Sequence, residues 1–207
     1  HIGENPEPYR TEAGKIRNAV NRSLWMPVKG WYGEYRDLLG LQRVHPVPAI
    51  WTIYHAIDAG ISDLFQEWQS LQYVNHHIPH IPIRVKELPG EEYYSLSTTR
   101  WMPYEWSINN VALAENLHMA LAFWQGGDPE KAFLLWKSQI LESMYLGGSP
   151  GNFHQLSSLD PFRGELYRDF ADPIGMAART LVEGLFGISP RLVEGRLIIE
   201  PGLPGDW

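Results

Sequence analysis

The segment VALAENLHMALAFW, residues 111–124, is followed by QGGD and then by PEKAFLLWKSQILES, residues 129–143, and this stretch decides the fold. The first part is apolar or small almost all round, which is typical of a helix covered on most sides. The second part spaces its large apolar side chains three and four apart among charged residues, which predicts a helix with one buried face. The short Gly-rich connection predicts a tight turn, so the two helices should form a hairpin.

The same pairing of helix types recurs along the chain. AIWTIYHAIDA, residues 49–59, leads through Gly60 into an amphipathic segment, and PIGMAARTLVEGLF, residues 173–186, is again apolar or small on most sides. Six helices are predicted, over residues 12–24, 48–59, 61–76, 108–124, 129–143 and 173–186. The large side chains expected to be buried in the two amphipathic helices are Ile61, Leu64, Phe65, Trp68, Leu71, Val74, Phe133, Trp136 and Ile140.

Three long connectors, residues 25–47, 77–107 and 144–172, each lead into a helix of the covered type. Because inner and outer helices alternate, the connectors should gather at one rim, and loops of this length are usually functional. The predicted fold is therefore all-α, an α/α-toroid made of about three helical hairpins, which is half of a six-hairpin ring. We expect the toroid part to span residues 1–190, and a β-strand with an extended tail to span residues 191–207.

Composition excludes several classes of protein. The 207 residues carry a net charge of -7, so a nucleic-acid partner is not expected, and no apolar stretch is long enough to span a membrane. Cysteine is absent, which excludes disulfide scaffolds and thiolate chemistry. The 9 Trp and 10 Tyr suit a sugar-binding cleft, because flat rings pack on the apolar face of a pyranose, although large rings also simply bury well.

The C-terminal third resembles the corresponding part of bacterial six-hairpin glycoside hydrolases and related glycosidase-like proteins. The resemblance is carried by FADPIGMAARTLVEGLFGISP, residues 170–190, and GRLIIEPGLPGDW, residues 195–207. Further pieces follow in the same order, namely LWMPVKGWYGEYRD, RVHPVPAIW, WMPYEWSINN, ALAFWQGG and LESMYLGGSPGNFHQ. The resemblance implies a carbohydrate substrate, polysaccharide degradation, and a periplasmic or extracellular bacterial location. The chain lacks the N-terminal half of such a ring, so that half or another chain is expected as a partner.

Hydrolysis of a glycosidic bond needs two carboxyl groups. Glu34 lies among Trp and Tyr residues in the first connector, and Glu105 lies between two aromatic residues in the second. Asp172 lies where similar glycosidases carry an acidic residue, at the start of their last inner helix. Each has a structural alternative: an ion pair with Arg36 or a solvated charge for Glu34, and helix capping for the other two.

Aromatic and histidine side chains on the same connectors are the candidates for binding sugar. They are Trp31, Tyr35, His45, Trp101, Trp106 and His154. The cluster His76, His77 and His80 lacks a metal-binding spacing, so we expect no metal and no other cofactor.

Two other functions remain open. In a polysaccharide lyase on the same scaffold, Tyr32 or Tyr35 with His45 would remove a proton, and Arg36 or Arg100 would neutralise the uronate. The chain would otherwise be a noncatalytic glycan-binding or structural domain. A half-ring also predicts exposed apolar flanks on its first and last inner helices.

Overall fold

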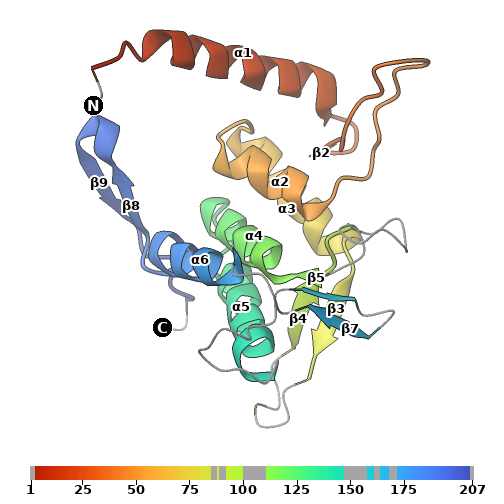
Figure 1. Ribbon diagram of the computed structural model, residues 1–207, viewed down its shortest axis with the longest axis vertical. Helices are drawn as coiled ribbons and strands as arrows, with labels where there is room; N and C mark the ends of the chain where they lie inside the picture. Colours follow the sequence, from red (N-terminus) through yellow and green to blue (C-terminus); the bar gives the residue numbers. More distant parts are fainter. Residues whose placement is uncertain are drawn as a thin grey trace.

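The computed structural model describes residues 3–84, 88, 92–99, 111–146, 158–160, 164–167 and 172–205 (Figure 1). The α-helices are α1 (Glu7–Leu24), α2 (Ile50–Asp58), α3 (Leu64–His77), α4 (Leu113–Gln125), α5 (Pro129–Ile140) and α6 (Asp172–Arg179). Two π-helices, η1 (Leu141–Leu146) and η2 (Thr180–Leu185), extend α5 and α6, and η3 (Leu192–Glu194) is a short 3-10 turn. The strands are β1 (Trp25–Met26), β2 (Trp31–Tyr32), β3 (His80–Ile83), β4 (Tyr93–Leu96), β5 (Val111–Ala112), β6 (Ser158–Asp160), β7 (Glu165–Tyr167), β8 (Ile188–Arg191) and β9 (Arg196–Ile199).

Helices α2, α4 and α6 run side by side in the same direction. Between α2 and α4, Tyr54 stacks on His118, and Asp58, one turn later, accepts a hydrogen bond from Gln125. Between α6 and α4, the contacts also advance together, because the Thr180 hydroxyl donates to a carbonyl of the middle of α4 at 3.1 Å and Gly184 lies against Trp124 near its end. Figure 1 shows α4 in the middle of this group.

Helices α3 and α5 return antiparallel to the helices that precede them. Gly60, with φ +62°, and Gly127, with φ +81°, adopt the left-handed conformation in the two connecting turns. Asp128, the last residue of the QGGD turn, accepts a hydrogen bond from the Lys131 backbone N–H and is the N-cap of α5. The main core forms where α2, α3, α4, α5 and β4 meet. Its large, almost completely buried members include Ile50, Ile53, Tyr73, Leu96, Met119, Phe123 and Leu135.

The prediction of which face of α5 is buried was wrong, because a different side of the helix faces the core. Ala132, Leu135, Ser138 and Gln139 are the buried residues, whereas the expected Phe133, Trp136 and Ile140 are only partly buried. The two polar residues are buried because they bind β4: Ser138 accepts from Tyr94 N–H, and the Gln139 amide donates to the Tyr94 carbonyl. An apolar pattern alone contains no information about such a strand.

Asn116 of α4 also binds the backbone of β4. Its side-chain oxygen accepts from Leu96 N–H at 2.6 Å, and its amide donates to the Leu96 carbonyl at 2.9 Å. Strand β4 pairs antiparallel with β3, in a connector that we expected to be irregular. The fold is therefore rich in helices but also contains short antiparallel strand pairs, which the all-α prediction did not include.

Helix α3 also departs from its predicted pattern. Leu71 and Val74 are buried, but Leu64, Phe65 and Trp68 are 82%, 65% and 54% exposed. The helix begins at a capping box in which Asp63 and Gln66 bind each other's backbone N–H groups. Only the second half of α3 packs into the core, so the first half presents its apolar residues to solvent.

The ends of α4 and α6 refine two further predictions. Helix α4 begins at Leu113 and not at residue 108, because Val111 and Ala112 pair with β6 instead. Gly187, with φ +63°, follows the α6 and η2 segment at the expected stop. The predicted C-terminal strand is confirmed as β9, and β8 is its antiparallel partner.

The segment after β9 is fixed to α4 through Trp124. The indole N–H of Trp124 donates to the Gly202 carbonyl at 2.7 Å, and Gly184 of η2 and Gly202 both lie directly against the ring. Side chains at these two positions would overlap the indole. None of the described helices is both long and apolar enough to cross a membrane.

We expect Gly184→Ala to lower the free energy of unfolding by roughly 1–3 kcal/mol, because its Cβ would overlap the Trp124 ring. Gly175→Ala in α6 is the matched control: a Cβ there meets nothing within 4 Å, so the change should be neutral or stabilise by up to about 1 kcal/mol. Urea denaturation of both variants measures the difference. Equal effects at the two sites would contradict the role of Gly184.

Candidate functional site

Described parts of the long connectors lie at the starts of the parallel helices α2 and α4. The Ile50 N–H at the start of α2 donates to the carbonyl of Thr98 in the second connector at 2.9 Å. Strand β5, directly before α4, pairs with β6, which belongs to the third connector, and β6 pairs with β7. We call the end of the molecule formed by the starts of α2, α4 and α6 the mouth. At the starts of α2 and α4, the described residues agree with the predicted convergence of the connectors.

Glu34 lies at the start of α2, where its carboxylate binds three donors. Oε2 accepts from Ala49 N–H at 2.8 Å and from the Thr52 hydroxyl at 2.6 Å, and Oε1 accepts from the Trp51 indole N–H. Glu34 makes these hydrogen bonds in place of the two structural alternatives, an ion pair with Arg36 or a solvated charge. Glu34 caps the helix from a distant part of the chain, and its negative charge is favourable at a helix N-terminus.

Tyr35, Asp37 and His45 form a second group in the first connector. The Tyr35 and His45 rings stack with centroids 3.9 Å apart, and His45 Nε2 lies 3.0 Å from Asp37 Oδ1. Tyr35 is exposed and His45 is half-buried. These side chains are accessible for a polar ligand. Tyr32 is not, because it is buried, its hydroxyl donates to Asn21, and burial raises its pKa well above the ordinary value.

Several predicted site residues are not among those described. Glu105, Trp101, Trp106, His154 and Arg100 lie outside the described residues. Asp172 is the first residue of α6, and its side chain lies outside the described part. Trp31 packs on Tyr73 and His77 of α3, and its indole N–H donates to the Pro46 carbonyl just before α2. Within the described ranges, no three His, Asp or Glu side chains are grouped so that they could hold a metal ion.

Glu142 is a candidate acid that the sequence analysis missed. It lies on the π-helix η1, which continues α5 beyond the residue that binds β4. Burial raises the pKa of this carboxyl group above its ordinary value. π-Helical turns are frequent at functional sites, and a raised pKa suits a proton donor. The sequence signal was a lone Glu in an apolar run at the end of a predicted helix.

A charged network links the other ends of the parallel helices. Arg179 Nη2 and Nη1 donate to the two oxygens of Asp58 at 2.7 and 2.9 Å, and His118 Nε2 lies 2.9 Å from Asp58 Oδ2. Arg179 Nε also donates to Glu183 at 3.1 Å. Hydrogen bonds from His118, and also from Arg179 and Gln125, hold the pKa of Asp58 well below its ordinary value, although burial opposes them. This geometry ties α2, α4 and α6 together.

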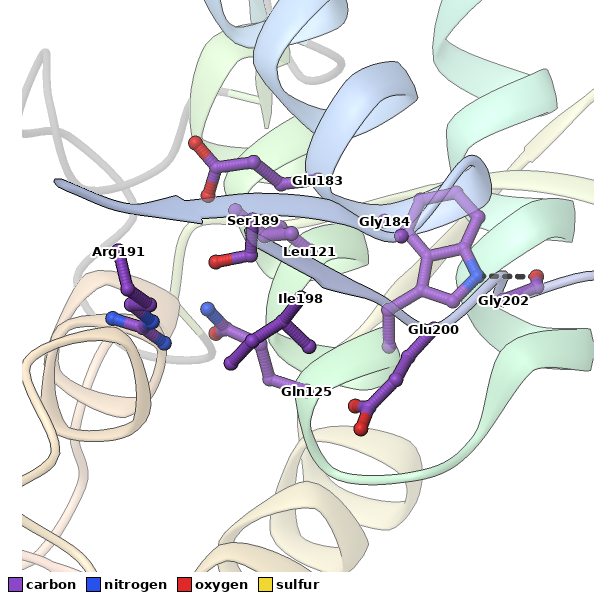
Figure 2. A pocket seen from close by; sticks show the side chains of 11 residues that line it. Leu121, Gln125, Glu183, Gly184, Ser189, Arg191, Ile198, Glu200 and Gly202 are labelled. Atoms are coloured by element: carbon purple, nitrogen blue, oxygen red, sulfur yellow. Dashed lines mark hydrogen bonds between the residues drawn. The ribbon is translucent and has the colours of Figure 1, made fainter. Parts of the chain in front are cut away.

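A cavity of about 270 Å³ adjoins this network between α4, η2 and the β8–β9 hairpin. Figure 2 shows Glu183, Gln125 and Arg191 toward one end of this cavity, and Glu200 and Gly202 toward the other; Trp124 also lines the cavity. Gln125 and Glu183 belong to both the cavity wall and the network. The cavity lies at the C-terminal ends of the helices, opposite the mouth, so it is not the cleft predicted from the connectors.

Comparison with known proteins identifies no relative. No protein-family model matches the chain, and no curated protein sequence matches it significantly. Function must therefore be argued from the residues and their geometry.

We expect Glu34→Gln to lower the free energy of unfolding by about 1–2 kcal/mol, because the amide removes the helix-capping charge and directs an N–H toward groups that donate. Thermal unfolding followed by circular dichroism measures this. Glu12→Gln, in an exposed pair with Lys15, is the control and should change stability by less than about 0.5 kcal/mol. A Glu34 variant as stable as the control would contradict the capping role.

We expect Asp58→Asn to lower the free energy of unfolding by roughly 1–3 kcal/mol at neutral pH, because the charged hydrogen bonds to Arg179 are lost. The difference from the unaltered protein should shrink as the pH falls below 3.8, the ordinary pKa of Asp. The unfolded carboxyl then takes up a proton while the folded one stays ionised, so acid favours unfolding of the protein with Asp58.

Denaturation across this pH range tests the expectation, with Glu7→Gln in an exposed pair with Arg10 as the control. A difference between the two proteins that is independent of pH would show that Asp58 does not act through its charge.

Proposed function

We propose that this chain is the C-terminal part of an α/α-toroid glycoside hydrolase that binds a poly- or oligosaccharide at the mouth. The observation that carries the proposal is that described parts of the second and third connectors lie at the N-terminal ends of two of the parallel helices, where Thr98 accepts from the start of α2 and β6 pairs directly before α4. An alternation of parallel inner helices with antiparallel outer ones is the arrangement that a toroid requires. The resemblance of residues 170–190 and 195–207 to six-hairpin glycosidases agrees with it.

The exposed flank of α6 supports the incomplete ring. Ile174, Val182 and Phe186 on α6 and its extension are 49%, 41% and 50% exposed. Most apolar residues of α2 are buried. The exposed apolar flank that a half-ring predicts is therefore found on the last inner helix and not on the first. The missing half of the ring, or another chain, would cover the α6 flank.

The catalytic pair is proposed among carboxyl groups near the mouth. The raised pKa of Glu142 suits the proton donor, because a general acid must be protonated at the working pH. Glu105 and Asp172 are the candidates for the ionised partner. Glu34 is better suited to positioning the start of α2, since its carboxylate oxygens already accept three hydrogen bonds.

Release of reducing ends from a panel of neutral and acidic polysaccharides tests the proposal. We expect Glu142→Gln, Glu105→Gln and Asp172→Asn each to reduce turnover by about 100-fold or more, with the folded state retained. Activity should decline as the pH rises through the pKa of Glu142, because the acid then loses its proton. The Glu12→Gln control should keep full activity. Unchanged turnover in all three variants would refute the carboxylate mechanism.

A polysaccharide lyase is the second candidate function, and the stacked Tyr35 and His45 pair favours it. In that reaction the tyrosine removes the proton beside a uronate carboxylate, and the leaving sugar departs with formation of a carbon–carbon double bond. The products then absorb ultraviolet light, whereas hydrolysis products do not. Loss of such absorbance in Tyr35→Phe, with the amide variants active, would select the lyase. Binding without either reaction would select the noncatalytic alternative.

A further inference from the structure

A shallow groove of about 180 Å³ lies between the outer face of α3 and the β1–β2 turn. Gly30 closes one side of it, with φ +78° and with Gln69 so near that a Cβ would lie 2.9 Å from the amide nitrogen. Lys29, Trp68, Gln72 and His76 line the groove, which shares no lining residue with the cavity in Figure 2. We refer to it as the α3 groove.

Trp68 is the exposed aromatic surface of the α3 groove. More than half of this residue is exposed, and Phe65 stacks beside it with ring centroids 5.8 Å apart and planes 20° apart. Trp31, in contrast, packs on Tyr73 at 4.6 Å and has Lys29 Nζ 5.5 Å from its ring centre. Because burial of a large ring is favourable, an exposed tryptophan beside polar side chains is a platform suited to a sugar ring.

The charges in the α3 groove select the kind of sugar. Lys29 contributes an ammonium group, His76 contributes an imidazole, and Gln69 and Gln72 contribute amides. Among the described residues that line it, none is Asp or Glu, although the whole chain has a net charge of -7. A carboxylate on the ligand would therefore find attraction here and repulsion over much of the remaining surface.

We propose that the α3 groove binds an acidic oligosaccharide, with one ring on Trp68 and a uronate carboxylate near Lys29 and His76. The aromatic groups of the groove would bind the apolar face of such a sugar, the amides its hydroxyls, and the cationic groups its carboxylate. This binding does not depend on a reaction at the mouth. It would hold a polymer against the outside of the helices.

Isothermal titration calorimetry of the full chain with tetragalacturonate tests the proposal, and neutral cellotetraose is the comparison ligand. We expect binding of the acidic sugar to weaken about tenfold in Trp68→Ala, through lost stacking. Lys29→Ala should weaken it severalfold and reduce its dependence on salt, because the ion pair is lost. Leu64→Ala is the matched control: it removes an exposed apolar side chain from the same helix without altering the groove, and affinity should not change.

Four outcomes would overturn the proposal: no binding at millimolar tetragalacturonate, equal affinity for cellotetraose, binding unaffected by both groove variants, or self-association abolished equally by Trp68→Ala and Leu64→Ala. Circular dichroism verifies that each variant is folded, and Gln72→Ala provides a second groove variant. Asp172→Asn should retain binding even if it loses hydrolysis, so failure of the groove and failure of the proposed reaction are distinguishable.

Discussion

The packing of the parallel helices depends on the hydrogen bonds that the Asp58 carboxylate accepts. Parallel helices bring their negative C-terminal ends together, and an aspartate at the end of α2 adds to that charge. Arg179, in the last turn of α6, offsets it through two hydrogen bonds, and His118 of the intervening α4 provides a third. One anion therefore joins three helices that run in the same direction.

The common direction decides where function can reside. When α2, α4 and α6 begin at the same end, the three connectors that precede them must also meet there. The second connector is further held by backbone-directed amides, since Asn116 and Gln139 bind β4 from two helices. The Asp58 network stabilises the opposite end, and the proposed function assigns ligand binding to the mouth.

Glu34 illustrates how tertiary context changes the role of a carboxylate. Its aromatic neighbours in the sequence suggested an acid in an apolar setting, yet the folded chain surrounds it with three hydrogen-bond donors at a helix terminus. Glu142 shows the reverse, because an ordinary position at the end of an amphipathic helix becomes a buried carboxyl with a raised pKa. Contacts formed only in the folded chain decide both outcomes.

The sequence by itself determined the existence and order of the six helices, the turns at Gly60 and Gly127, the cap at Asp128 and the C-terminal strand, because these depend on local spacing and backbone conformation. Only the tertiary structure decided which face of α5 is buried, that Trp68 is exposed, and that Asp58, His118 and Arg179 meet. Those features depend on contacts between residues up to 121 positions apart, which periodicity within one helix cannot encode.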